Sequence, residues 1–212
     1  MLFRPSRTLF LALLAATAGA GAQTINFDGV TTAPDALIPN GYGGFDWNNF
    51  YVASPALLGP PYSTSGYENG LHGGKYVGFN GYGNPSKICT VGNTMSIHGF
   101  SGYFTAGWTN DDVLTITGLC GTKVIQTIQT GLVESGPKFL DITFSAPVSA
   151  IQFSTFSPTT TSSQMVLSDF TINPPATPET ASLATLGFGV GACSLARRRR
   201  LRFAPSATSG AC

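Results

Sequence analysis

The chain has 212 residues, only 10% of them charged, and its formal net charge of +1 hides an uneven distribution. The arginines lie only near the two ends of the chain, while the body between Gln23 and Pro178 holds four lysines against nine acidic residues, a net charge of −5. An acidic body without a basic run lacks the Lys and Arg contacts that bind phosphate backbones, so we expect no nucleic-acid partner.

The first 22 residues have the three-part layout of a secretory signal peptide. Arg4 and Arg7 precede an uncharged apolar run over residues 9–18, and a small-residue cleavage site ends at Ala22. The ten residues of the apolar run are too few to cross a bilayer, which argues against a lasting N-terminal anchor. We therefore expect cleavage after Ala22 and export of the remaining chain.

Residues 23–173 have the length and pattern of one β-domain. Short runs of β-branched and aromatic residues alternate with Gly, Pro, Asn, Asp and Ser, without sustained apolar spacing of helical period. Alternation of apolar and polar side chains from Leu140 to Phe144 is typical of a half-buried strand. Strands at this spacing without helical crossovers predict an all-β fold, an antiparallel two-sheet β-sandwich of jelly-roll type. The expected strands are residues 24–27, 46–53, 75–80, 96–105, 113–119, 123–130, 138–144, 149–156 and 164–172.

Two cysteines, Cys89 and Cys120, lie within this domain. An exported chain meets oxidising conditions, which permit a disulfide between them. Closing a loop of about thirty residues would stabilise the fold by about 3 to 4 kcal/mol in the chain-entropy model. The alternative is two buried free thiols.

The C-terminal region predicts a short transmembrane helix. A proline-rich spacer over residues 174–180 ends the domain and leads to an uncharged stretch over residues 181–196, about 24 Å long as a helix. An arginine cluster at residues 197–202 follows it, and residues 203–212 form a final tail. The helix is marginal for a bilayer about 30 Å thick, so we expect a transient anchor with its arginines in the cytoplasm.

The tail resembles a known sorting signal. Its order of tripeptide, apolar stretch and arginines is similar to that of bacterial PEP-CTERM proteins, with Thr180 in place of the usual second proline. The matching residues are Pro178, Glu179, Thr180, Arg197, Arg198, Arg199 and Arg200. The resemblance implies processing by an exosortase near the tripeptide and delivery to the surface or extracellular matrix of a Gram-negative bacterium.

The body also resembles that of many PEP-CTERM proteins, which are β-sandwiches of poorly characterised function. The similar segments are residues 25–28, 42–51, 101–108 and 166–172. This resemblance covers most of the domain but implies little about its chemistry.

Five aromatic residues are candidates for ligand binding. Their flat faces suit the apolar faces of pyranose rings, while polar neighbours suit the sugar hydroxyls. The alternative is that these rings belong to the core. The candidates are Tyr42, Trp47, Tyr51, Tyr82 and Trp108.

Asp28 and Asp169 are candidates for a structural calcium site. They fall near the ends of the first and last predicted strands, which commonly lie side by side in such sandwiches. Backbone carbonyls would have to supply most of the six to eight oxygens that Ca²⁺ requires. The alternative is hydrogen bonding at the strand ends, and we expect no other cofactor.

No catalytic residues are predicted, because His72 and His98 form no paired zinc motif and no Gly-x-Ser-x-Gly elbow exists. We expect a non-enzymatic surface or matrix protein that associates with exopolysaccharide. Two alternatives stay open: a carbohydrate-active hydrolase using paired carboxylates, and a structural matrix protein without a specific ligand.

Overall fold

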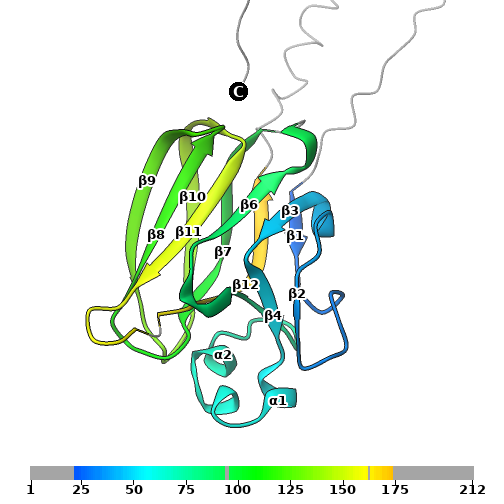
Figure 1. Cartoon of the computed structure of the whole chain (residues 1–212), viewed down its shortest axis with the longest axis vertical. Coiled ribbons are helices and arrows are strands. Elements are labelled where there is room, and N and C mark those ends of the chain that lie inside the picture. Colours follow the sequence, from blue (N-terminus) through cyan, green and yellow to red (C-terminus); the bar gives the residue numbers. More distant parts are fainter. Residues whose placement is uncertain (1–21, 94–95, 162, 174–212) are drawn as a thin grey trace, which may run out of the picture.

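The computed structural model describes residues 22–93, 96–161 and 163–173, which form two antiparallel sheets packed face to face (Figure 1). The predicted signal peptide, sorting signal and apolar helix lie outside these residues. Within the described ranges, no helix is long and apolar enough to cross a membrane. The prediction of an antiparallel two-sheet sandwich is confirmed.

Seven strands form the larger sheet, in the order β10-β7-β12-β5-β4-β2, with β1 also paired to β12. All of its pairings are antiparallel. Its strands are β1 (Gln23–Ile25), β2 (Asp35–Leu37), β4 (Phe50–Ala53), β5 (Val77–Asn80), β7 (Ile97–Ala106), β10 (Lys138–Val148) and β12 (Met165–Asn173).

Five strands form the smaller sheet, in the order β3-β6-β11-β8-β9, again with antiparallel pairing throughout. They are β3 (Phe45–Asn48), β6 (Ser86–Thr90), β8 (Asp112–Cys120), β9 (Lys123–Leu132) and β11 (Ala150–Phe156).

Aromatic side chains fill the space between the sheets. Phe153 of β11 is fully buried, and its ring centroid lies 5.8 to 6.3 Å from those of four other phenylalanines. These four come from three strands of the opposite sheet: Phe50, Phe100, Phe104 and Phe170. Three of these contacts are edge-on and the one with Phe104 is stacked, and both geometries stabilise aromatic pairs beyond the burial of their surface. Ring contacts therefore join the two sheets at the centre of the core.

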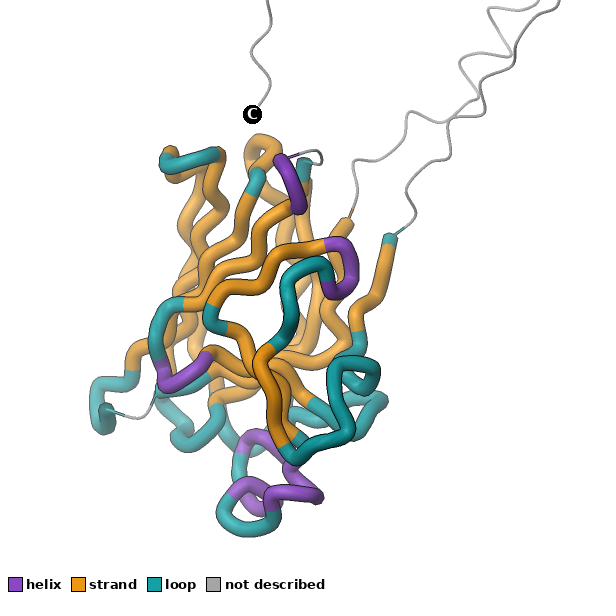
Figure 2. The backbone as a smooth tube through the Cα atoms, turned by 45° about the vertical axis from the view of Figure 1, so that its right-hand side comes forward, coloured by secondary structure: helices purple, strands orange, loops and turns teal. Residues whose placement is uncertain are grey.

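A helical insertion, residues 54–71, lies at the lower end of the sandwich in Figure 1, and Figure 2 shows its helices in purple. Its side chains pack on the face of the larger sheet that points away from the main core. It contains α1 (Pro55–Leu58), α2 (Gly66–Asn69) and the 3₁₀ turn η2 (Tyr62–Thr64). Tyr67 of the insertion packs with Val77 and Val166 in a cluster separate from the main core. The sheet is therefore apolar on both faces at this end.

Each predicted strand overlaps an observed one, but the predicted strand over residues 46–53 is two strands in different sheets. Asn49 separates them with a φ of +56°, a conformation that breaks an extended strand. The short strands β2 and β6 and the four-residue helices were not predicted. Segments this short show too few repeats of either side-chain period to be recognised.

The predicted disulfide between Cys89 and Cys120 is wrong, because Cys89 is a free cysteine. Ala150 of β11 pairs with Cys89 on one side and with Leu119, the neighbour of Cys120, on the other. The strand β11 thus separates the two cysteines. Two interstrand spacings place their backbones about 9.5 Å apart, beyond the span of a disulfide of about 7 Å.

Replacing Cys89 with serine tests this correction. The free energy of unfolding, measured by urea denaturation, should change by less than about 1.5 kcal/mol, because the variant loses a partly buried thiol but no covalent link. Loss of a disulfide closing this loop would instead cost about 3 to 4 kcal/mol, and a change of that size would contradict the structure.

Candidate functional site: an aromatic groove

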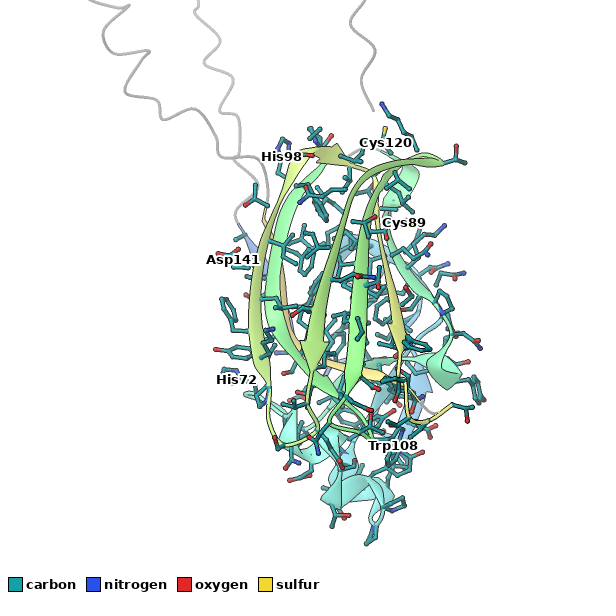
Figure 3. The ribbon with its side chains drawn as sticks, turned by 90° about the vertical axis from the view of Figure 1, so that its left-hand side faces the viewer. His72, Cys89, His98, Trp108, Cys120 and Asp141 are labelled. Carbon is teal, nitrogen blue, oxygen red and sulfur yellow. The ribbon has the colours of Figure 1, made fainter. Side chains whose placement is uncertain are left out.

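Of two adjoining hollows, the smaller lies where the helical insertion meets the larger sheet. The larger, of about 560 Å³, is lined by Tyr82, Trp108, Thr161 and Gln164. The smaller, of about 160 Å³, is lined by Asp35, Tyr51, Tyr62, Tyr67, Phe79, Gly81, Tyr82 and Gln164. Because Tyr82 and Gln164 line both, we treat the two as one site, the aromatic groove. Figure 3 shows Trp108 at this end of the sandwich.

The rings of the groove form a continuous series of contacts. The Tyr82 ring meets Tyr51 with centroids 6.2 Å apart, and Tyr51 meets Phe79 at 5.7 Å. The ring of Tyr67 lies 5.3 Å from Phe79 and 5.2 Å from Trp108. Tyr62 completes the series, 5.1 Å from both Tyr67 and Trp108. Each aromatic ring of the groove is consequently held in position by contact with at least one other ring of the groove.

Gln164 fixes two of these rings with one amide group. Its Oε1 accepts a hydrogen bond from the Tyr67 hydroxyl at 2.9 Å and another from Trp108 Nε1. Its Nε2 donates to the Asn80 carbonyl oxygen at 3.3 Å. Burial raises the pKa of Tyr67, so this phenol stays protonated as a donor. The indole and the phenol are therefore oriented before any ligand arrives.

Tyr82 is 84% exposed, yet the turn that carries it is firmly braced. Its φ of +53° is rare for a residue with a side chain, and such strain costs about 1 to 3 kcal/mol. Asn49 Nδ2 donates to the carbonyls of Gly81, Asn84 and Pro85, and Asn80 Nδ2 also donates to Asn84. These hydrogen bonds hold the turn so that it presents an aromatic ring to solvent.

Three of the five predicted ligand-binding aromatics, Tyr51, Tyr82 and Trp108, meet in the groove. Trp47 does not, because it is only 4% exposed, packs in the main core and donates its Nε1 to the Tyr42 carbonyl. That part of the prediction is wrong. Tyr42 lies apart from the groove, where its hydroxyl donates to the Asn26 carbonyl oxygen at 2.6 Å.

Sequence reasoning missed the other residues of the groove. Three of them are Tyr62 in the helical insertion, Gln164 just before β12, and Asp35 in the edge strand β2. The Pro-Pro-Tyr segment that contains Tyr62 predicts an aromatic side chain in a loop, but nothing in the segment indicates which residues that side chain contacts. Only the packing of the insertion onto the sheet brings these three together.

The predicted calcium ligands lie on the paired first and last strands or just beyond them, and both contact the segment of residues 72–76. β1 pairs with β12, as expected. Asp28 accepts hydrogen bonds from the backbone N–H groups of Lys75 and Tyr76, at 2.8 and 3.1 Å. Asp169 Oδ2 lies 2.7 Å from Nδ1 of His72, whose ring stacks on Tyr103. In the described part of the chain, no three His, Cys, Asp or Glu side chains gather as metal ligands, and the calcium site stays a prediction.

The turn after Trp108 holds two carboxylates with opposite environments. Asp112 is fully buried and accepts a hydrogen bond from the Thr109 hydroxyl at 2.8 Å, and burial raises its pKa. Asp111 accepts from the hydroxyls of Thr159 and Ser157, which lower its pKa. These bonds tie the Trp108 turn to the loop that follows β11.

No protein-family model matches the sequence, and no curated protein sequence matches it. Solved structures give distant likenesses. The K2 cleaved adhesin domain of Lys-gingipain is 11% identical with a TM-score of 0.43, covering 72% of this chain and 99% of that domain. TmCBM61 in complex with β-1,4-galactotriose is 10% identical with a TM-score of 0.38, covering 64% and 94%. A mutant of CBM29-2, a family 29 carbohydrate-binding module, is 15% identical with a TM-score of 0.38, covering 73% and 92%. These likenesses are too distant to assign a ligand to this chain.

The two carboxylates of the Trp108 turn predict opposite dependences of stability on pH. A raised pKa in the folded state makes the ionised Asp112 unfavourable, so Asp112→Asn should gain stability over the wild type as the pH rises above about 4. A lowered pKa makes the ionised Asp111 favourable, so Asp111→Asn should lose stability relative to the wild type as the pH rises toward about 4, and the loss should then stay constant at higher pH.

Urea denaturation of the three proteins from about pH 3 to about pH 7 measures both differences. Each variant serves as the control for the other, because they remove adjacent carboxylates of the same charge. Differences of the same sign for both variants would contradict the environments described above.

Proposed function

We propose that this chain is an exported, non-enzymatic surface or matrix protein that binds polysaccharide in the aromatic groove of a jelly-roll-like β-sandwich. The observation that carries the proposal is the exposed Tyr82 ring on a strained and braced turn, beside Tyr51 and within the same groove as Trp108. A ring held in solvent by a costly backbone conformation is expected where it contacts a ligand.

The chemistry of the groove suits sugar rings. Aromatic faces pack against the apolar faces of pyranoses, and the hydroxyls of Tyr51, Tyr62 and Thr161 offer hydrogen bonds to sugar hydroxyls. The two hollows are open to solvent on the surface, which allows a long chain to enter sideways. A polysaccharide segment therefore fits this site better than a compact, fully enclosed ligand does.

The carboxylates favour binding over hydrolysis. Glycosidases generally use two carboxyl groups about 5 to 9.5 Å apart across the scissile bond. Asp35 is the single acidic residue among the described residues that line the groove. A structural matrix protein without a ligand is less well supported, because it does not account for the strained turn that holds Tyr82 in solvent.

Export is supported by the sequence at both ends of the chain: a signal-peptide layout over residues 1–22, and an arginine cluster behind an apolar stretch. We take the tail to be a sorting signal that an exosortase removes after transient anchoring in the inner membrane. The acidic, arginine-free body would then remain at the surface or in the matrix.

Mass spectrometry of the protein recovered from its native host tests this export route. We expect an N-terminus at Gln23 and a C-terminus near Glu179, because both targeting segments are removed. Recovery of a chain that still ends at Cys212 would contradict processing of the tail.

Polysaccharide binding is tested with variants of the groove. Tyr82→Ala and Trp108→Ala should each weaken binding about tenfold or more, since loss of a ring at the centre of an interface commonly costs more than about 1 kcal/mol. Affinity electrophoresis against a panel of neutral, basic and acidic polysaccharides, followed by calorimetry, measures this effect.

The matched control is Phe139→Ala, which removes a ring that is 54% exposed on β10, outside the groove. This variant should bind like the wild type. Circular dichroism checks that each variant is folded. If no polysaccharide in the panel binds, or if all three variants bind equally well, the proposed function is wrong.

A further inference from the structure

The smaller hollow of the groove combines aromatic walls with one carboxylate. Five rings line it, those of Tyr51, Tyr62, Tyr67, Phe79 and Tyr82, and Asp35 is its only charged residue in the described part of the chain. Its volume of about 160 Å³ is less than a third of that of the adjoining hollow, at about 560 Å³. The smaller hollow therefore suits a single sugar unit or one substituent of it.

Several rings of the hollow stand at steep angles to one another, although Tyr51 and Phe79 are inclined by only 33°. The planes of Tyr51 and Tyr82 meet at 79°, and those of Tyr62 and Tyr67 also meet at 79°. A cation near aromatic faces is attracted by about 0.5 to 1 kcal/mol at exposed sites and by about 2 kcal/mol or more when desolvated. Anions gain nothing from such faces.

The Asp35 carboxylate is free to meet a ligand. Asp35 begins the edge strand β2, where its backbone lies opposite Ala53, and the Ser54 N–H bonds to the Pro34 carbonyl oxygen just before it. The backbone at Asp35 is thus held in place. In the described ranges, its exposed carboxylate has no hydrogen-bond or ion-pair partner.

The charges around the groove also favour a cationic ligand. No Lys, Arg or His is among the described residues that line either hollow. The body as a whole carries four lysines against nine acidic residues. A polysaccharide rich in uronate or sulfate groups would meet repulsion and no counter-charge, whereas an ammonium group would meet Asp35 and electron-rich ring faces.

We infer that the smaller hollow binds the ammonium group of an amino sugar, and that Asp35 determines this specificity. The inference rests on the proposed function, because the larger hollow is taken to bind the neighbouring sugar units of the same chain. The Tyr51 and Tyr82 faces contact the charged unit, and the Asp35 carboxylate accepts its N–H hydrogen bonds.

The test compares three oligosaccharides of equal length by calorimetry at about pH 6, where a sugar amine is protonated. They are a glucosamine oligomer, its fully N-acetylated counterpart and a galacturonate oligomer. The wild type should bind the glucosamine oligomer about tenfold or more tighter than the N-acetylated one, and the galacturonate oligomer weakest.

Asp35→Asn should abolish the preference for the glucosamine oligomer, so that the glucosamine and N-acetylated oligomers bind with about equal affinity. Asp141→Asn is the matched control, because Asp141 is exposed on β10, away from Trp108 (Figure 3). It should keep the preference. Equal losses in both variants would indicate general charge attraction and overturn the role of Asp35.

The outcomes separate the inference from the function on which it rests. Equal binding of the glucosamine and N-acetylated oligomers, still weakened by Tyr82→Ala, would overturn the ammonium site and leave polysaccharide binding intact. Failure of every oligosaccharide and polysaccharide to bind would overturn the proposed function itself. Choline binding tighter than the glucosamine monomer would overturn the amino sugar as the source of the cation.

Discussion

The larger sheet is apolar on both faces at one end, and the aromatic groove exists because of this constraint. Leu167 of β12 points into the main core, while its neighbour Val166 points outward and is also fully buried. An apolar outer face requires a cover, which the helical insertion provides through Tyr67 and Leu71. The groove forms along the seam where this cover ends, since rings there pack on one side and meet solvent on the other.

A network of amide groups turns that seam into an ordered site. The side chain of Asn80 accepts a hydrogen bond from the Met165 N–H and donates to Thr155 and Asn84, and its backbone carbonyl accepts from Gln164. Gln164 in turn holds Tyr67 and Trp108. Because buried amides are costly to leave unpaired, each member of the network restricts its neighbours. Orientation of the rings is thereby linked to the pairing of β5 with β12.

Backbone strain lies where the sandwich departs from regular strands. Asn49, Tyr82 and Asp169 all have positive φ without being glycine. Asn49 separates β3 from β4 and braces the turn of Tyr82, so two of the three strained residues support the groove. Asp169 lies at an irregularity in the pairing of β12 with β7, which directs its carboxylate to His72. Strain of this kind persists because the surrounding hydrogen bonds and packing determine the conformation.

The sequence alone determined the two-sheet architecture. Apolar and polar side chains alternate within each strand, and turn residues separate the strands, so both patterns can be recognised without knowing which strands become neighbours. It also indicated Tyr51, Tyr82 and Trp108, since aromatic residues near glycines and turns are visible without a partner. Only the tertiary structure decided that Trp47 is in the core, that β11 separates Cys89 from Cys120, and that Asp35, Tyr62 and Gln164 complete the groove. The reason is physical: burial and distance depend on which strands become neighbours, and that pairing joins residues as far apart in the chain as Gln23 and Ile172.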